Sequence, residues 1–374
     1  MRVTAPAALG EALQDLDTPC LVLDREAFVR NHDRLMHSMS GIGVAVRPHA
    51  KSHKCPEIAR HQIRNGAVGI CCQKVSEAEA FADEGIENIL VANEFFGQKK
   101  IHRYLALASR LPAIACCVDH PDQVAALSLA AEQSRIRLRL LVEIDVGQGR
   151  CGVQDLSDAV ALASQIAQSP WLEFAGIQGY HGSAQHFRSY SERLGAISSA
   201  ADRIRALHGE LGKLGIEAPW RTGGGTGSYA IEAKSGAYTE VQPGSYVFMD
   251  ADYQRNQPAP DAQQPVFEHA LYVAATVMSR PSPDRAVLDA GLKSFSVDSG
   301  LPVLDGPAGC TYVKASDEHG VVSTKNSSSL QLGDVLRVIP GHCDPTVNLY
   351  DHIVVMSEGR VVDVWPISAR GRSC

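Results

Sequence analysis

The feature that most constrains the fold is the regular alternation of short apolar runs and helical stretches between about residues 25 and 250. The β-prone runs predict strands at 44–46, 68–72, 89–91, 114–118, 138–144, 174–180, 219–222 and 240–246. Amphipathic stretches lie between them, such as 76–83, 122–134 and 191–214. About eight such units predict an α/β fold with a (β/α)8 TIM-like barrel, because a doubly wound open sheet usually needs fewer units.

After about residue 265 the pattern changes to short β-rich runs separated by Gly, Pro, Asp and Asn. These runs lie at 271–278, 286–289, 335–339, 352–356 and 361–366. They predict a C-terminal antiparallel β domain, and we expect the early run 18–24 to join its sheet. The predicted domains are residues 25–262 for the barrel, and residues 1–24 together with 263–374 for the β domain.

The composition argues against a nucleic-acid-binding, membrane or secreted protein. The chain has 374 residues, is 45% hydrophobic and carries a net charge of −7, which gives a sizeable core and no nucleic-acid footprint. No run of 18 apolar residues predicts a membrane span, and residues 1–17 lack the basic and apolar regions of a signal peptide. We therefore expect a cytoplasmic protein whose ten cysteines are reduced.

Lys51 lies in the segment Ala-Val-Arg-Pro-His-Ala-Lys-Ser-His-Lys at 45–54, just past the first predicted strand. Arg47, His49 and Lys54 are close in sequence, and like charge lowers the pKa of an amine. A neutral amine can attack a carbonyl to form a Schiff base. The segment therefore predicts a reactive lysine, and the alternative is a solvated basic loop.

Polar residues also follow several later strands, and in a barrel the functional residues lie at these C-terminal strand ends. The polar positions are Gln73 after the second strand, Asn93 and Glu94 after the third, 143–152 after the fifth and 178–186 after the sixth. Each alone could be a solvated loop. So many on one face favour a site that includes Arg150, Tyr180 and His186.

The seventh predicted strand ends in a glycine-rich turn, Arg-Thr-Gly-Gly-Gly-Thr-Gly-Ser-Tyr at 221–229. Gly224, Gly225 and Thr226 let backbone N–H groups approach an anion, because glycine has no side chain to block it. Barrels commonly hold a phosphate at this place. Glycine runs are also common in turns, and no Gly-Lys-Ser/Thr follows, so the turn is not a Walker A motif.

The segment 340–348 holds a candidate metal site. In an extended segment residues i and i+2 point the same way, so His342 and Asp344 could bind one cation while Cys343 points away. An imidazole and a carboxylate suit Mn²⁺, Mg²⁺, Co²⁺ or Zn²⁺. Two protein ligands leave positions for water or substrate, as in a catalytic site. The alternative is a polar turn.

Taken together, these segments resemble the D-threonine aldolase and D-serine dehydratase group of fold-type III pyridoxal-phosphate enzymes, which have an alanine-racemase-like barrel. The matching segments cover nearly the whole chain, in order: 18–24, 47–54, 72–79, 143–153, 223–229, 289–291, 317–320 and 340–348. The resemblance implies a barrel that binds pyridoxal 5'-phosphate and a homodimer. It also implies a β domain that supplies the ligands of a divalent metal, with Mn²⁺ or Mg²⁺ favoured and Zn²⁺ or Co²⁺ possible.

The resemblance implies a role for each candidate residue. It places Lys51, Gln73, Arg150, Tyr180, Gly224, Gly225 and Thr226 at the cofactor, and His342 and Asp344 at the metal. Lys51 would form the Schiff base, Arg150 would sit near the pyridoxal 3-oxygen, and Tyr180 would flank the ring. The turn Gly224–Thr226 would hold the phosphate, and His186 would assist a proton transfer.

The metal motif bears on the reaction. The dehydratases resemble His-x-Cys at this place, whereas Asp344 gives His-x-Asp, which resembles the aldolase branch. The 3-hydroxy-D-aspartate aldolases resemble it too, so the aldehyde is open between acetaldehyde and glyoxylate. The predicted function is a lyase that cleaves a D-3-hydroxy-amino acid of the D-threonine type to glycine and an aldehyde. The alternatives are a D-serine or 3-hydroxy-D-aspartate dehydratase, which gives an oxo acid and ammonia, and a non-catalytic pyridoxal-phosphate carrier.

Overall fold

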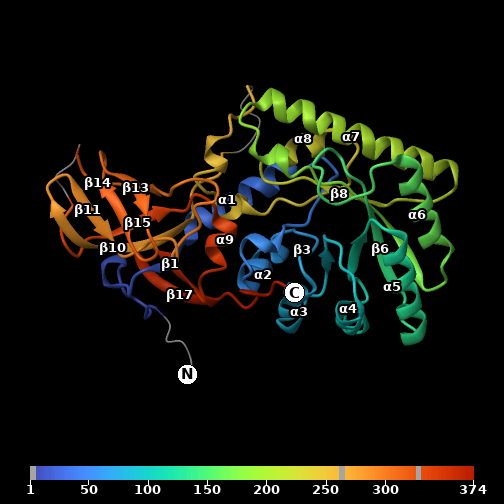
Figure 1. The fold of residues 1–374 in the computed structure, drawn as a ribbon, viewed down its shortest axis with the longest axis horizontal. Helices are drawn as coiled ribbons and strands as arrows, with labels where there is room; N and C mark the ends of the chain where they lie inside the picture. The colour runs from blue at the N-terminus through green and yellow to red at the C-terminus, as the bar shows by residue number, and fades with distance from the viewer. Residues whose placement is uncertain (1–5, 261–265, 326–329) are drawn as a thin grey trace.

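The computed structural model describes residues 6–260, 266–325 and 330–374, and two sheets organise them, one toward each end of the molecule (Figure 1). The first sheet has eight strands in the order β2-β9-β8-β7-β6-β5-β4-β3, and all of its pairs are parallel. Its strands are β2 (Ala45–Val46), β3 (Ile70–Cys72), β4 (Ile89–Val91), β5 (Ala115–Val118), β6 (Leu138–Glu143), β7 (Leu172–Gln178), β8 (Trp220–Gly223) and β9 (Glu240–Val241).

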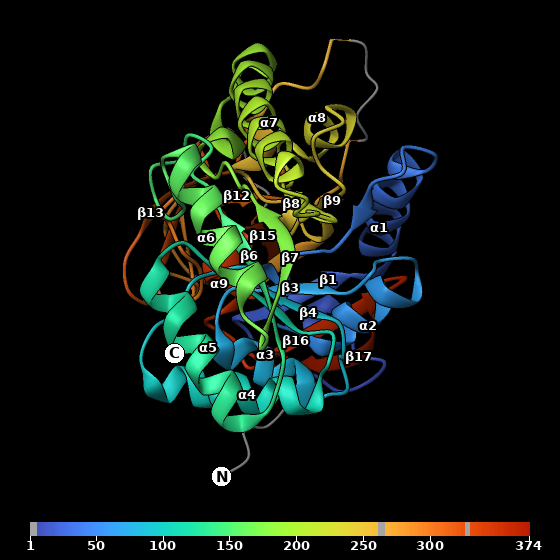
Figure 2. The ribbon, with the colours of Figure 1, turned by 90° about the vertical axis from the view of Figure 1, so that its right-hand side faces the viewer.

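This sheet curls into a barrel, because its two edge strands approach each other. The N–H of Val68 donates to the carbonyl oxygen of Val46 at 3.0 Å, and the N–H of Cys71 donates to that of Pro48 at 2.8 Å. The helices that connect the strands pack around the outside (Figure 2). They are α2 (Pro56–Arg64), α3 (Val75–Asp83), α4 (Gln98–Arg110), α5 (Pro121–Ser134), α6 (Leu156–Gln168), α7 (Tyr190–Lys213) and α8 (Tyr229–Lys234). The helix α1 (Arg25–Met39) contacts β2 and α8 and completes the ring, so the predicted barrel is confirmed.

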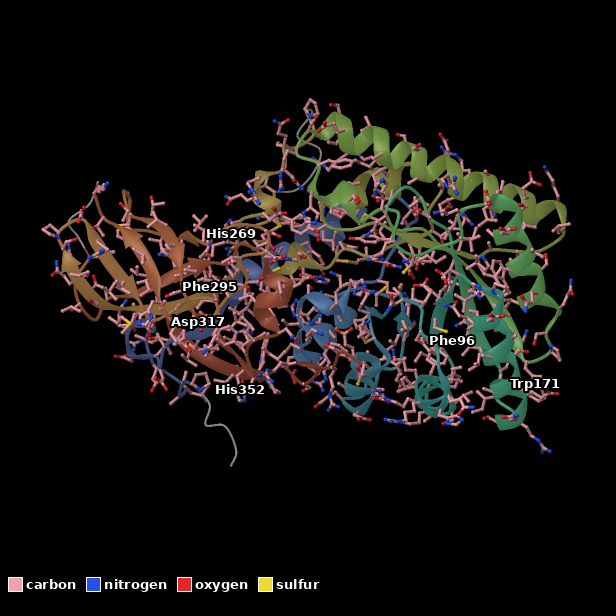
Figure 3. All side chains as sticks on the ribbon, viewed as in Figure 1. Phe96, Trp171, His269, Phe295, Asp317 and His352 are labelled. Carbon is pink, nitrogen blue, oxygen red and sulfur yellow. The ribbon has the colours of Figure 1, made fainter. Side chains whose placement is uncertain are left out.

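The barrel strands are short and apolar because the helices cover their outer face. Every residue of β3, β4 and β5 is buried, which is typical of a parallel sheet covered on its outer face. Inside the barrel, Arg47 is 2% exposed, pairs with Glu240 at 2.9 Å and lies over the ring of Trp220. Side chains fill the space between both sheets and their helices (Figure 3).

The second sheet has nine strands and is mostly antiparallel. Its strands are β1 (Cys20–Asp24), β10 (Leu271–Ser282), β11 (Arg285–Leu288), β12 (Val303–Leu304), β13 (Thr311–Ala315), β14 (Gly320–Ser323), β15 (Val335–Ile339), β16 (His352–Ser357) and β17 (Arg360–Pro366). As predicted, β1 joins this sheet, between β10 and β16. The pair of β1 with β16 is parallel, which is an exception to the predicted antiparallel domain.

The two regions meet at helix α9 (Cys343–Val347), which packs against the 3-10 turn Ala50–Ser52 after β2 (Figure 1). The prediction of an extended segment at 340–348 is therefore wrong, because a short helix begins directly after the extended residue His342. The predicted domain boundary between residues 262 and 263 lies outside the described residues. Among the described helices, none combines the length and apolar character needed to cross a membrane.

Candidate active site

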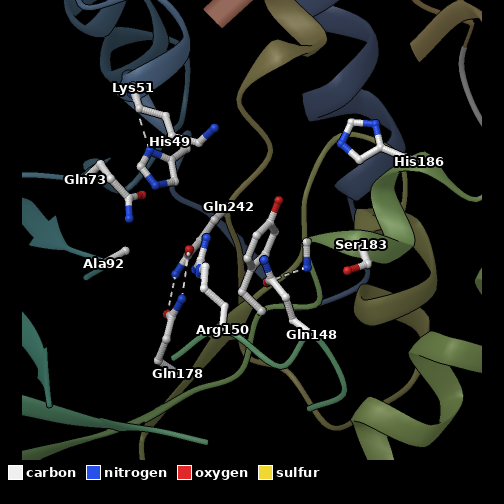
Figure 4. Close-up of a pocket in the computed structure, with 12 residues that line it drawn as sticks. His49, Lys51, Gln73, Ala92, Gln148, Arg150, Gln178, Ser183, His186 and Gln242 are labelled. Atoms are coloured by element: carbon white, nitrogen blue, oxygen red, sulfur yellow. Dashed lines mark hydrogen bonds between the residues drawn. The ribbon is translucent and has the colours of Figure 1, made fainter. Parts of the chain in front are cut away.

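A cavity of about 310 Å³ opens at the C-terminal ends of the barrel strands (Figure 4). Its lining residues are His49, Lys51, Gln73, Ala92, Gln148, Arg150, Gln178, Tyr180, Gly182, Ser183, His186 and Gln242. The structure thus brings together five predicted site residues, namely Lys51, Gln73, Arg150, Tyr180 and His186. They converge because parallel barrel strands all end at the same rim.

Lys51 lies on the 3-10 turn after β2, and its amine meets a carboxylate of the β domain. Its Nζ donates to Oδ2 of Asp344 at 2.6 Å, and Asp344 also accepts a bond from the Ser245 hydroxyl at 3.2 Å. The side chain of Asp344 is 12% exposed and that of Lys51 is 39% exposed. Lys51, which lines the cavity, therefore contacts one predicted metal ligand directly.

The charges around Lys51 differ from the expected cluster of cations. Arg47 pairs with Glu240 and Lys54 pairs with Glu77, while burial lowers the pKa of His49 to about 3 and keeps that ring neutral. Burial opposes the charge on Lys51, but the carboxylate of Asp344 outweighs it and raises the pKa of Lys51. The expectation of a lowered lysine pKa is wrong for this state, because one carboxylate lies closer than any free cation.

His186 is held by a buried carboxylate. It ends the 3-10 turn Ser183–His186 after β7, and its Nδ1 bonds to Oδ2 of Asp252 at 2.6 Å. Arg188 donates to Oδ1 of Asp252 at 2.5 Å, and Arg255 also pairs with that carboxylate. Burial opposes ionisation of Asp252, but its bonds with Arg188 and His186 outweigh burial and lower the pKa of Asp252. With Nδ1 donating to Asp252, the Nε2 atom of His186 is left to accept a proton from the cavity.

A carboxylate also orients the ring of His342. Its Nδ1 bonds to Oδ2 of Asp298 at 2.8 Å, so its Nε2 atom is available as a ligand. A carboxylate behind a histidine ring is the arrangement that commonly supports a metal-binding histidine. Cys343 is fully buried, and its N–H donates to Asp250 at 2.9 Å. The donor types of His342 and Asp344 therefore fit a divalent cation, although neither residue is among the described residues that line the cavity.

The glycine-rich turn after β8 lies outside the set of lining residues but is built tightly. Gln185 and Glu232 pack against it, and a Cβ at Gly225 would lie 2.6 Å from Oε1 of Gln185. The N–H groups of Gly224 and Thr226 donate to no other described residue. Free backbone N–H groups can donate hydrogen bonds to a phosphate. The amine of Lys51 can form a Schiff base with an aldehyde. The residues present therefore suit pyridoxal phosphate.

Arg150, Tyr180 and Gln73 line the same cavity as Lys51. The guanidinium of Arg150 lies over the ring of Tyr180, 5.8 Å from its centroid. Burial raises the pKa of Tyr180 and keeps the phenol neutral. The N–H of Gln73 donates to Oε2 of Glu77 at 2.7 Å, which caps helix α3 and fixes the position of Gln73.

Sequence reasoning missed three residues that support the site. Gln242 exchanges amide hydrogen bonds with Gln178, drawn in Figure 4, and also donates to Thr222 at 2.7 Å. Gln242 was not recognised as a site residue because the strand was predicted over 240–246, whereas β9 ends at Val241. Asp252 and Asp298 carry no local signal, since each acts through a histidine that is distant in the sequence.

Comparisons with known proteins agree with this geometry. A model of the alanine racemase N-terminal domain matches residues 23–252, and a model of a putative serine dehydratase domain matches residues 270–356. A D-threonine aldolase of Arthrobacter sp is 48% identical over 371 residues, which cover 98% of this chain and 96% of the relative. The chain belongs to the D-threonine aldolase family. The resemblance seen in the motifs and the predicted lyase class are confirmed.

Two further matches cover nearly the whole chain. A 3-hydroxy-D-aspartate aldolase of Paracoccus denitrificans (strain Pd 1222) is 44% identical, covering 98% of this chain and 95% of the relative. The crystal structure of D-threonine aldolase from Filomicrobium marinum superposes with a TM-score of 0.96 at 45% identity, covering 99% of this chain and 100% of that one. The family implies a pyridoxal-phosphate cofactor.

Proposed function

We propose that this protein cleaves D-3-hydroxy-amino acids of the D-threonine type to glycine and an aldehyde, using pyridoxal 5'-phosphate and a divalent metal. The observation that carries the proposal is the 2.6 Å contact between Lys51 and Asp344 in the strand-end cavity. It places a lysine of the barrel beside a carboxylate of the β domain. An aldolase of this kind needs both, a group that holds the cofactor and a group that holds the metal.

The cofactor and the metal supply what the side chains lack. Pyridoxal phosphate, when bound, supplies a sink for the electron pair released at Cα, and a divalent metal lowers the pKa of the substrate hydroxyl. Lys51 would hold the cofactor, with Arg150, Tyr180 and Gln73 around it. The turn Gly224–Thr226 would offer N–H groups to the phosphate.

His186 is the residue we assign to the proton transfer. Cleavage of the Cα–Cβ bond requires the β-hydroxyl to lose a proton, and Cα must gain one to give glycine. Asp252 holds Nδ1 of His186, so Nε2 can take the hydroxyl proton. Arg188 and Arg255 keep Asp252 ionised, which fixes the tautomer of the ring.

The ligand type favours cleavage over elimination. His342 and Asp344 offer a nitrogen and an oxygen, which suit Mn²⁺ or Mg²⁺ as well as Zn²⁺ or Co²⁺. Cys343 is fully buried beside Asp250, and burial raises its pKa well above the ordinary value, so it is a poor thiolate ligand here. The C-terminal match to a dehydratase domain leaves elimination as the second candidate.

Product analysis tests the proposal. The purified protein would be incubated with D-threonine, 3-hydroxy-D-aspartate and D-serine, with and without added Mn²⁺. We expect glycine with acetaldehyde or glyoxylate, and a rate that rises with the metal. Ammonia and an oxo acid, with no glycine, would reject the aldolase and support the dehydratase. No product from any substrate would support the pyridoxal-phosphate carrier.

We also propose that the protein works as a homodimer in the cytoplasm. The support for the location is its ten cysteines, which are free in the structure and suit a reducing compartment. Light scattering of the purified protein at micromolar concentration tests the dimer, and the mass of a single chain would reject it.

A further inference from the structure

A second group of potential metal ligands lies behind Arg150, on three neighbouring barrel strands. Glu94 follows β4, Asp119 follows β5, and Cys151 lies in the loop after β6. One ligand atom from each of the three lies within 4.8 Å of the others. None of these three residues lines the cavity that contains Lys51, so the group is distinct from the proposed catalytic site.

A buried carboxylate without a partner points into this group. Glu143, the last residue of β6, has a side chain that is 4% exposed, and its Oε2 accepts no hydrogen bond from a described residue. Its carboxylate faces that of Glu94, whose two oxygens are also buried and without a partner. Unpaired buried carboxylate oxygens are costly, so this cluster needs either a bound cation or a proton shared between the two glutamates.

The ionised form of this cluster has little positive charge to stabilise it. Among the described residues, Arg150 is the one cation within 4.0 Å of these carboxylates, with Nη2 at 4.0 Å from Oε1 of Glu143. Burial and the neighbouring carboxylates raise the pKa of both Glu143 and Glu94. A bound divalent cation would stabilise the ionised carboxylates.

The backbone holds Cys151 in place for this role. The N–H of Gly152 donates to Oδ2 of Asp119 at 3.0 Å, and that of Val153 donates to the carbonyl oxygen of Glu143 at 2.9 Å. Gly152 has φ +102°, and a Cβ there would lie 2.5 Å from the nitrogen of Asp145, so the loop requires glycine. The two residues that directly follow Cys151 are thus tied to the ends of β5 and β6.

We infer that Glu94, Asp119, Glu143 and Cys151 form a second, structural divalent-metal site. Carboxylate oxygens with one thiolate suit Zn²⁺ best among common cations, with Co²⁺ as a spectroscopic substitute. The ligand atoms of Glu94, Asp119 and Cys151 lie within 4.8 Å of one another, and zinc bonds of about 2.0–2.3 Å require them to move closer together. The metal would clamp the loop after β6 and thereby fix Arg150 at the cavity wall.

Metal analysis of the whole enzyme tests the site. After loading with Zn²⁺ and dialysis, the wild type should retain about two equivalents per chain, since each site binds one ion. Cys151→Ser and Glu94→Gln should each retain about one, and Asp344→Ala should lose the other one. Cys310→Ser, a change at a cysteine of similar exposure elsewhere, should match the wild type.

A second readout detects the thiolate directly. Co²⁺ added to the enzyme should give a near-ultraviolet sulfur-to-cobalt band in the difference spectrum. The band should vanish in Cys151→Ser and persist in Cys343→Ser. If Cys151→Ser and Glu94→Gln keep the metal content of the wild type and the cobalt spectrum is unchanged, the inference is wrong and the two glutamates share a proton instead. That result would leave the proposed aldolase function untouched, because His342 and Asp344 are counted separately.

Discussion

The barrel and the β domain contribute to the proposed active site in different ways. The barrel supplies residues from many strand ends, because all eight parallel strands finish at one rim. The β domain supplies its residues through the single segment at 340–348, where α9 packs on the turn that carries Lys51. Barrel topology alone therefore gathers the proposed cofactor residues, whereas the proposed metal ligands depend on how segment 340–348 packs against the barrel, at the turn Ala50–Ser52 and at residues 250–252.

The largest effect should come from the barrel side. Lys51→Ala should lower kcat by about 10³-fold or more, because the residue that holds the cofactor covalently is gone. Borohydride should no longer fix pyridoxal phosphate to the protein, which a peptide map can verify. Lys74→Ala, a lysine that follows β3, is the matched control and should retain both properties. A reduced adduct on Lys54 or Lys74 in the wild type would reject the assignment.

The next effect concerns proton transfer. His186→Asn should lower kcat by about 10²-fold or more while cofactor and metal contents stay unchanged. Asp252→Asn should have a smaller effect on kcat, because it only releases the ring from its tautomer and orientation. Steady-state kinetics and metal analysis measure both. Unchanged turnover in His186→Asn would give His186 a structural role alone.

The phosphate turn should show a moderate effect. Gly225→Ala places a Cβ 2.6 Å from Oε1 of Gln185, so either the turn or the Gln185 side chain, which accepts a bond from the Gly227 N–H, must shift. We expect cofactor affinity to fall about tenfold, which corresponds to about 1.4 kcal/mol. Gly209→Ala is the control, since a Cβ there meets no atom within 4 Å. Equal affinity in the two variants would count against the turn as a phosphate site.

The smallest effect on activity is expected for Glu232, which packs against the glycine-rich turn. Its replacement should instead change how the free energy of unfolding depends on pH. Burial raises the pKa of Glu232 to about 7, while in the unfolded chain the carboxyl has its ordinary value near 4.5. The folded state therefore retains a proton that the unfolded state releases, and the free energy of unfolding should fall as pH rises from about 4.5 to 7. Glu232→Gln should remove this part of the slope. Urea unfolding at pH 5 and pH 7.5 measures it, and parallel slopes for the two proteins would refute the pKa shift.

The comparison also shows what the sequence could predict. The strands predicted at 89–91 and 335–339 are β4 and β15, with the same bounds. A continuous apolar run predicts a strand well when helices or another strand cover it. The strands β12, β13 and β14 were missed. β12 is only two residues long, and β13 is half exposed, so neither carries a strong apolar pattern.

The site was predictable in part for the same reason. Lys51, Arg150 and His186 could be placed at the cavity because each follows a recognisable strand. The 340–348 segment was given the wrong conformation, since Pro345 within a helix of five residues leaves no helical period to detect. Asp252 and Asp298 could not be found, because their only signal is a tertiary hydrogen bond.

Replacement of Asp344 tests the account most directly, because it separates the two contributions to one cavity. In Asp344→Ala we predict that borohydride still fixes the cofactor to Lys51, that one metal equivalent is lost, and that aldehyde formation from D-threonine falls to background. Cys343→Ser should keep both the metal and the activity. If Asp344→Ala retains the metal and Cys343→Ser loses it, the proposed ligand pair is wrong and the dehydratase hypothesis is favoured.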